Sequence, residues 1–137
     1  MGLSPPPRAN SSEVNEMANP VTWFEIIGGD GIGLHGFYKN VFGWKLSDPM
    51  AEMGNYSMLD NEGHGIGGGV GAEMPGQGGR VTVYIEVNDP QAYLDKVTAS
   101  GGTMIMPVTD VTPEVTIAMF TDPAGNVVGL LKGDGSH

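Results

Sequence analysis

The chain contains no cysteine, and this absence excludes several kinds of chemistry at once. Disulfide bridges, zinc-thiolate sites and thiol nucleophiles all depend on that side chain. The sequence is therefore compatible with a reducing compartment, and we expect a cytoplasmic protein.

Basic residues and long apolar runs are also scarce. Lys and Arg total 6 against 16 Asp and Glu, which gives a formal net charge of -10. Such a chain repels a phosphate backbone and an anionic membrane surface, so we expect no nucleic-acid partner. No apolar run approaches the ~20 residues needed to span a bilayer, and the N-terminal segment lacks the apolar core of a signal peptide. We expect no membrane partner and favour a neutral or cationic small molecule as the ligand.

Glycine, in contrast, is abundant. The 137 residues include 23 Gly and 10 Pro, which predicts many turns and short strands in one small domain. Residues 1–19 contain three consecutive prolines and few large apolar side chains, the composition of a disordered leader. We assign residues 20–132 to the domain and 133–137 to a flexible tail.

The domain consists of two copies of one module, at about 20–70 and 81–132. Each copy opens with a strand-like segment, and a helical pattern follows that starts at an Asp and stops at a Gly. The interval from Asp30 to Asp89 equals that from Gly43 to Gly102. Three more strands are predicted after each helix, at 44–47, 56–59 and 64–70 and at 103–108, 115–121 and 126–131. The expected fold class is α+β, with two βαβββ modules forming a curled sheet around a cavity.

Two segments of the chain resemble the vicinal oxygen chelate superfamily. Residues 37–44, FYKNVFGW, are similar to that family's FYxxxFGW helix end, and residues 120–126, FTDPAGN, are similar to its DPxGN turn. The family includes glyoxalase I, extradiol dioxygenases, fosfomycin-modifying enzymes and bleomycin-binding resistance proteins. The resemblance implies the scaffold more strongly than any one chemistry.

Metal-using members of that family hold a divalent ion with four His, Glu or Gln ligands. The resemblance places those positions at Trp23, Gly67, Thr82 and Gly129, and none of these residues is a usual metal ligand. It therefore implies no metal cofactor. The two glycines predict a roomier cavity, and Trp23 predicts a flat apolar wall for a planar or cationic ligand.

Strand alternation identifies the polar groups of this cavity. Glu25 shares a face with Trp23, while Tyr84 and Glu86 share a face with Thr82. Glu25, Tyr84 and Glu86 are the candidate catalytic residues, as a ligand clamp or as a carboxylate base beside a phenol donor. A solvated strand end for Glu86 and a core hydroxyl for Tyr84 remain open. The predicted ligand-binding residues are Trp23, Glu25, Met58, Gly67, Thr82, Tyr84, Met119 and Gly129.

Three functions are compatible with these residues. The first is metal-independent binding of a small organic molecule, cationic or aromatic, with sequestration of that ligand as the role. The alternative is a glyoxalase-type lyase or isomerase whose metal has moved to Glu25, Glu86 and His64. The third is a domain for assembly with a partner protein, its cavity vestigial. The family resemblance also makes a homodimer compatible with the chain.

Overall fold

A computed structural model describes residues 18–133, so the predicted leader and tail lie outside the described residues, apart from 18, 19 and 133. Within that range, eight strands form one sheet in the order β2-β3-β4-β1-β5-β8-β7-β6. The elements are β1 (Val21–Ile27), α1 (Ile32–Phe42), β2 (Lys45–Leu46), η2 (Ala51–Met53), β3 (Ser57–Asp60), β4 (Gly67–Gly71), β5 (Arg80–Val87), α2 (Pro90–Ala99), β6 (Thr103–Thr112), β7 (Val115–Thr121) and β8 (Val127–Lys132). Neither helix in the described part of the chain is long and apolar enough to cross a membrane.

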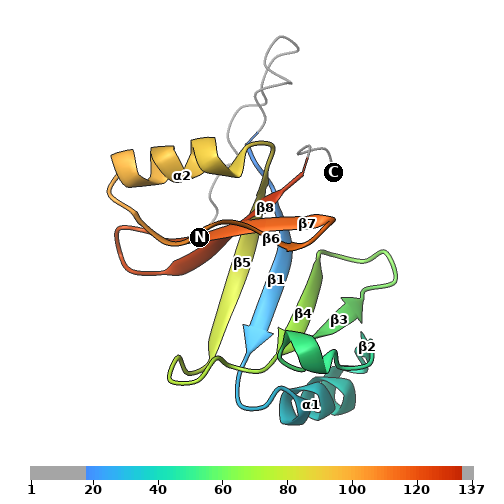
Figure 1. Ribbon diagram of the computed structural model, residues 1–137. Coiled ribbons are helices and arrows are strands. Elements are labelled where there is room, and N and C mark those ends of the chain that lie inside the picture. The colour runs from blue at the N-terminus through green and yellow to red at the C-terminus, as the bar shows by residue number, and fades with distance from the viewer. Residues whose placement is uncertain (1–17, 134–137) are drawn as a thin grey trace, which may run out of the picture.

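The sheet consists of two similar halves that meet at its centre. In each half the first strand pairs in parallel with the last, β1 with β4 and β5 with β8. The halves join through the antiparallel pair β1 and β5, which run side by side while α1 and α2 lie at opposite ends (Figure 1). This curled, unclosed sheet confirms the α+β class and the two βαβββ modules.

The helix boundaries follow from local capping. Asp89 caps α2 by accepting a hydrogen bond from the Ala92 amide at 3.2 Å, and Pro90 occupies the first turn. Gly43 ends α1 in the left-handed conformation, as expected. The predicted cap Asp30 is one residue too early, because α1 is preceded by Gly31 at φ 83. Asp30 still accepts from the Ile32 amide at 3.0 Å, so its side chain serves the same first turn.

In the turn between β7 and β8, hydrogen bonds between Asp122 and Asn126 close the DPxGN-like segment. Asp122 Oδ1 accepts from the amides of Ala124 and Asn126, both at 2.9 Å, and Oδ2 accepts from the Asn126 side chain at 2.9 Å. These hydrogen bonds to the ionised form hold the pKa of Asp122 below its ordinary value. The carboxylate thus fixes the geometry of the turn.

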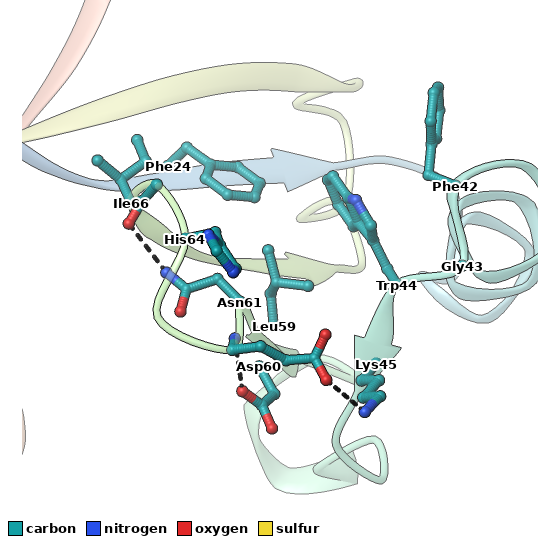
Figure 2. A pocket seen from close by; sticks show the side chains of 12 residues that line it. Phe24, Phe42, Gly43, Trp44, Lys45, Leu59, Asp60, Asn61, His64 and Ile66 are labelled. Atoms are coloured by element: carbon teal, nitrogen blue, oxygen red, sulfur yellow. Dashed lines mark hydrogen bonds and ion pairs between the residues drawn. The ribbon is translucent and has the colours of Figure 1, made fainter.

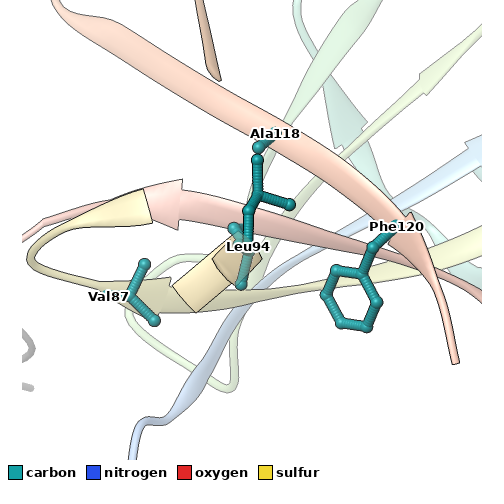
Figure 3. Close-up of a cluster of buried hydrophobic side chains, with 5 residues drawn as sticks. Val87, Leu94, Ala118 and Phe120 are labelled. Atoms are coloured by element: carbon teal, nitrogen blue, oxygen red, sulfur yellow. The ribbon is translucent and has the colours of Figure 1, made fainter. Parts of the chain in front are cut away.

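The main apolar core lies between α2 and the second half of the sheet. Leu94 of α2 packs against the strands among the buried residues Val87, Ala118, Phe120 and Leu130 (Figure 3). In the first half, α1 packs on β4 through the buried His35, whose Nε2 lies 3.0 Å from the Val70 carbonyl oxygen. Because both helices cover the outer side of the sheet, the inner, concave side is left for the candidate site.

Candidate functional site

Five strands bring one row of residues together on the concave face. Trp23 of β1 lies beside Gly67 of β4 on one side and beside Tyr84 of β5 on the other. Tyr84 in turn lies beside Gly129 of β8, and Gly129 beside Met119 of β7. This row contains five of the eight predicted ligand-binding residues, namely Trp23, Gly67, Tyr84, Met119 and Gly129.

A second row runs parallel to the first, one step along the strands. Glu25 lies beside Thr82 on β5 and beside Gly69 on β4, and Gly69 lies beside Met58 on β3. Thr82 is therefore in the row of Glu25, and Tyr84 rather than Thr82 lies opposite Trp23. Thr82 is almost completely buried, whereas Met58 is exposed.

Aromatic rings occupy the space above the glycines of these rows. A Cβ at Gly129 would lie 2.2 Å from Tyr84 Cδ2, and a Cβ at Gly67 would lie 2.7 Å from Trp23 Cζ3. Gly69 is covered in the same way by the ring of Tyr56, with a Cβ at 2.1 Å from its Cζ. The expectation that Gly67 and Gly129 enlarge the cavity is therefore wrong, because rings of the same chain lie flat against the strand backbone there.

Glu25 is the charged centre of this aromatic surface. Its Oε1 accepts hydrogen bonds from the Tyr84 hydroxyl at 3.0 Å and from Arg80 Nη1 at 3.2 Å. Arg80 also donates to the Thr82 hydroxyl at 3.1 Å. The Glu25 side chain is 14% exposed and that of Arg80 34%, so the ion pair is partly shielded from water. A carboxylate, a guanidinium and a phenol on two neighbouring strands thus form one hydrogen-bonded group.

A further hydrogen bond continues the group toward the edge of the sheet. Trp23 Nε1 donates to the Tyr56 hydroxyl at 3.0 Å, which links β1 to the residue just before β3. Burial, followed by the negative charge of Glu25, raises the pKa of Tyr56 well above its ordinary value. Burial, the Glu25 charge and the hydrogen bond to Glu25 raise the pKa of Tyr84 similarly. Both phenols therefore remain protonated, as donors, through the neutral range.

Glu86 lies apart from this group although it faces the same side. It is buried, and its Oε1 accepts from the Thr22 hydroxyl at 3.3 Å. Its position on β5 is four residues beyond Thr82, the partner of Glu25, which at ~3.4 Å per residue separates the two rows by about 14 Å. Of the three candidate catalytic residues, the structure joins Glu25 and Tyr84 and leaves Glu86 at the other end of the strand.

The alternative metal site of Glu25, Glu86 and His64 is also not assembled. His64 lies on the turn between β3 and β4, in a pocket with Phe24, which points to the sheet face opposite Glu25. Within residues 18–133, no group of three His, Asp or Glu side chains converges as a metal site would require.

The residues at the family's metal positions do not fit a divalent ion. These positions offer neither imidazole nor carboxylate. They hold the indole of Trp23, two glycines without side chains, and a hydroxyl from Thr82 or Tyr84. A carboxylate at either glycine would collide with the ring that covers it. Both the donor set and the steric fit of this row therefore disfavour a divalent ion at these positions.

Sequence reasoning missed Tyr56 and Arg80 as members of the site. Arg80 stands two residues before Thr82 and thus on the same face of β5, a signal that strand alternation alone could have provided. Tyr56 could be placed only once β3 was known to pair with β4 next to Gly69.

The fold and site define a class: a two-module α+β domain with a polar and aromatic concave face. Residues 23–130 match the family model of the Glyoxalase/Bleomycin resistance protein/Dioxygenase superfamily. The chain belongs to that superfamily, which confirms the resemblance of its two signature segments.

Two curated relatives show moderate similarity. CFP32 of Mycobacterium bovis, provisionally named a glyoxylase, is 31% identical over 119 residues, which cover 82% of this chain and 45% of that protein. The anthracycline biosynthesis protein DnrV of Streptomyces peucetius is 30% identical over 120 residues, covering 75% of this chain and 43% of that one. The chain thus spans about half the length of the curated relatives it matches.

Solved structures share the fold at much lower identity. Hypothetical protein BH1468 from Bacillus halodurans has a TM-score of 0.66 at 14% identity, with 88% of this chain and 99% of that chain covered. Methylmalonyl-CoA epimerase from Mycobacterium tuberculosis has a TM-score of 0.61 at 14% identity, with 82% and 86% covered. At this identity the comparison supports the architecture alone.

The raised pKa of Tyr84 predicts a pH dependence of stability. A phenol with a higher pKa in the folded than in the unfolded chain stabilises the fold below about pH 10, and that contribution is lost as the pH rises further. Tyr84→Phe should cost about 1–3 kcal/mol at neutral pH through loss of a hydrogen bond to a charged group. Urea unfolding from pH 8 to 11 should show a smaller alkaline loss of stability for the variant than for the wild type. Equal slopes would contradict the assignment.

Proposed function

We propose that this chain binds a small organic molecule, cationic or aromatic, on the concave face and sequesters it without a divalent metal. The observation that carries the proposal is the Glu25 carboxylate, partly shielded and surrounded by aromatic rings. Aromatic faces attract cations, and a shielded carboxylate adds a charge-assisted hydrogen bond. This combination suits an organic cation.

The aromatic surface supports binding of a planar ligand in particular. The rings of Trp23 and Tyr56 are partly exposed and lie against glycine backbone on neighbouring strands, so they are held without bulky neighbours beneath them, while the ring of Tyr84 is buried. Rigid rings lose little conformational entropy when a ligand stacks on them. The net charge of -10 also favours an approaching cation.

Sequestration is favoured over catalysis because Glu25 already has partners. Its Oε1 accepts from both Tyr84 and Arg80. A base must reach a substrate proton in a geometry suited to its transfer. We therefore assign Glu25 a binding role, and we propose the cytoplasm as the location because a chain without cysteine requires no oxidising compartment.

Assembly is a second candidate, favoured by apolar surface on α1. Phe37 and Val41 lie four residues apart on one helix face and are 52% and 56% exposed. The curated relatives are about twice as long as this chain, which leaves room in each for a second domain. We propose that a second copy of this chain covers the exposed face of α1 as a homodimer.

The binding role of Glu25 predicts a charge-selective loss of affinity. Glu25→Gln should weaken binding of planar organic cations about 10- to 100-fold, because a hydrogen bond to a charged group is lost. A thermal-shift screen of planar cations and their anionic analogues would select the probe, and calorimetry would measure the affinity. Glu114→Gln, which removes a carboxylate from the exposed turn between β6 and β7, is the matched control. A screen without any stabilising cation would count against the proposal.

Metal independence predicts a low metal content. Protein incubated with nickel, zinc, cobalt or manganese and then desalted should retain far less than one ion per chain by elemental analysis, because the row of Trp23 and Gly67 offers no suitable donors. Ligand affinity should also be unchanged by a chelator. A stoichiometric ion, or turnover of a hemithioacetal with an added metal, would overturn the proposal in favour of a glyoxalase-type enzyme.

If the exposed face of α1 forms the homodimer interface, a charge introduced on that face should give a monomer. Phe37→Glu should convert a dimer to a monomer in sedimentation equilibrium, since a charge buried at an apolar interface is not compensated. Met74→Glu, in an exposed loop, is the control and should leave the dimer intact. A wild-type protein that stays monomeric at all concentrations would contradict assembly through α1.

A further inference from the structure

A pocket lies on the opposite side of the sheet, away from Glu25. Its cavity has a volume of about 350 Å³, and it is formed by the end of α1, by β2 and β3, and by the turn between β3 and β4. Its apolar lining consists of Phe24, Phe42, Trp44, Leu59 and Ile66. None of these side chains belongs to the Glu25 group, although Phe24 is the direct neighbour of Trp23 in β1. The volume is at the small end of the range for ligand pockets.

The aromatic side of the pocket has a defined geometry. Phe24 lies flat on β4, because Gly68 has no side chain and a Cβ there would be 2.1 Å from Phe24 Cε1. Trp44 stacks on Tyr38 with centroids 4.8 Å apart and an interplanar angle of 17°. Figure 2 shows Trp44 on one side of the pocket and His64 and Leu59 on the other. One face of the Trp44 indole thus packs on Tyr38, and the other face is turned toward the pocket.

The polar rim of the pocket is mostly satisfied by its own contacts. Asp60 accepts from the Glu62 amide at 2.9 Å, and Asn61 donates to the Gly65 carbonyl at 3.0 Å. Lys45, labelled in Figure 2, forms an ion pair with Glu62. His64 differs, since its imidazole makes no hydrogen bond within the described residues, although its backbone amide is held by Asn61 at 2.9 Å. One imidazole is therefore available to a ligand.

Size, ring geometry and charge together define the ligand class. Among the charged groups at the rim, the charge of Glu62 is balanced by that of Lys45, and the carboxylate of Asp60 remains. The pocket therefore carries a net negative charge, which disfavours anionic ligands. We propose that this pocket binds a planar heteroaromatic molecule, neutral or singly cationic, between Trp44 and His64. An unprotonated ring nitrogen of the ligand accepts a hydrogen bond from the imidazole N–H, or a protonated one donates to the bare imidazole nitrogen, while the ring stacks on the indole.

The two tryptophans make the pocket testable separately from the concave face. Each indole N–H gives its own NMR resonance, and the Trp23→Phe variant assigns them. Quinoline is the probe, and 1-naphthoate is its anionic counterpart of similar shape. Quinoline should shift the Trp44 indole and the His64 amide in a saturable way, also in the Glu25→Gln variant. Failure of this site and failure of the proposed function are thereby distinguished.

Two variants test the lining. His64→Ala should weaken quinoline binding about three- to tenfold, the value of one hydrogen bond, and Ile66→Ala should weaken it through lost contact. Met74→Ala is the control and should have no effect. The proposal is overturned if the Trp44 resonance does not move, if His64→Ala and Ile66→Ala bind quinoline as the wild type does, or if 1-naphthoate binds as tightly as quinoline.

Discussion

The antiparallel pairing of β1 with β5 is the interaction on which the rest of the molecule depends. Each module alone has a sheet edge at its first strand, and an unpaired edge exposes backbone amides and carbonyls. Pairing the two edges satisfies these groups and sets the register that places Trp23 opposite Tyr84 and Glu25 opposite Thr82. A shift of one residue would turn Glu25 away from the concave face. The backbone ladder and the candidate site are therefore fixed by the same contacts.

Alternation along β1 gives the two faces of the sheet different characters. Trp23 and Glu25 contribute to a face where a carboxylate, a guanidinium and two phenols interact. Phe24, between them, contributes to an apolar slot on the other face. One short strand thus supplies both proposed ligand sites, and the glycines of β4 make room for its rings on both faces.

Much of the fold could be predicted because its signals are local. Asp89, Gly43 and Asp122 act through hydrogen bonds or backbone angles within a few residues, and such signals are visible in sequence. β7 begins and ends where alternation predicted. β6 extends to Thr112 rather than to residue 108, and η2 was missed, because strand length at a sheet edge and short turns depend on tertiary pairing.

The candidate site was predicted less completely, for a physical reason. The face of Glu25 and Tyr84 follows from strand period, and their hydrogen bond agrees with it. The position of Thr82 relative to Trp23 depends on the register between two strands, which the equal spacing of the modules did not determine. The filling of glycine positions by Tyr84 and Trp23 depends on ring orientation, which has no counterpart in the linear sequence.

The rings over Gly67 and Gly129 constrain how this chain can evolve. A single change of either glycine to a carboxylate-bearing residue meets a ring already in place, so a metal ligand cannot be gained there one residue at a time. The ring must be lost first, and losing it from Tyr84 also removes a donor from Glu25. A carboxylate introduced at either glycine before the ring is lost therefore gives a less stable intermediate, and the order of substitutions is restricted by sterics.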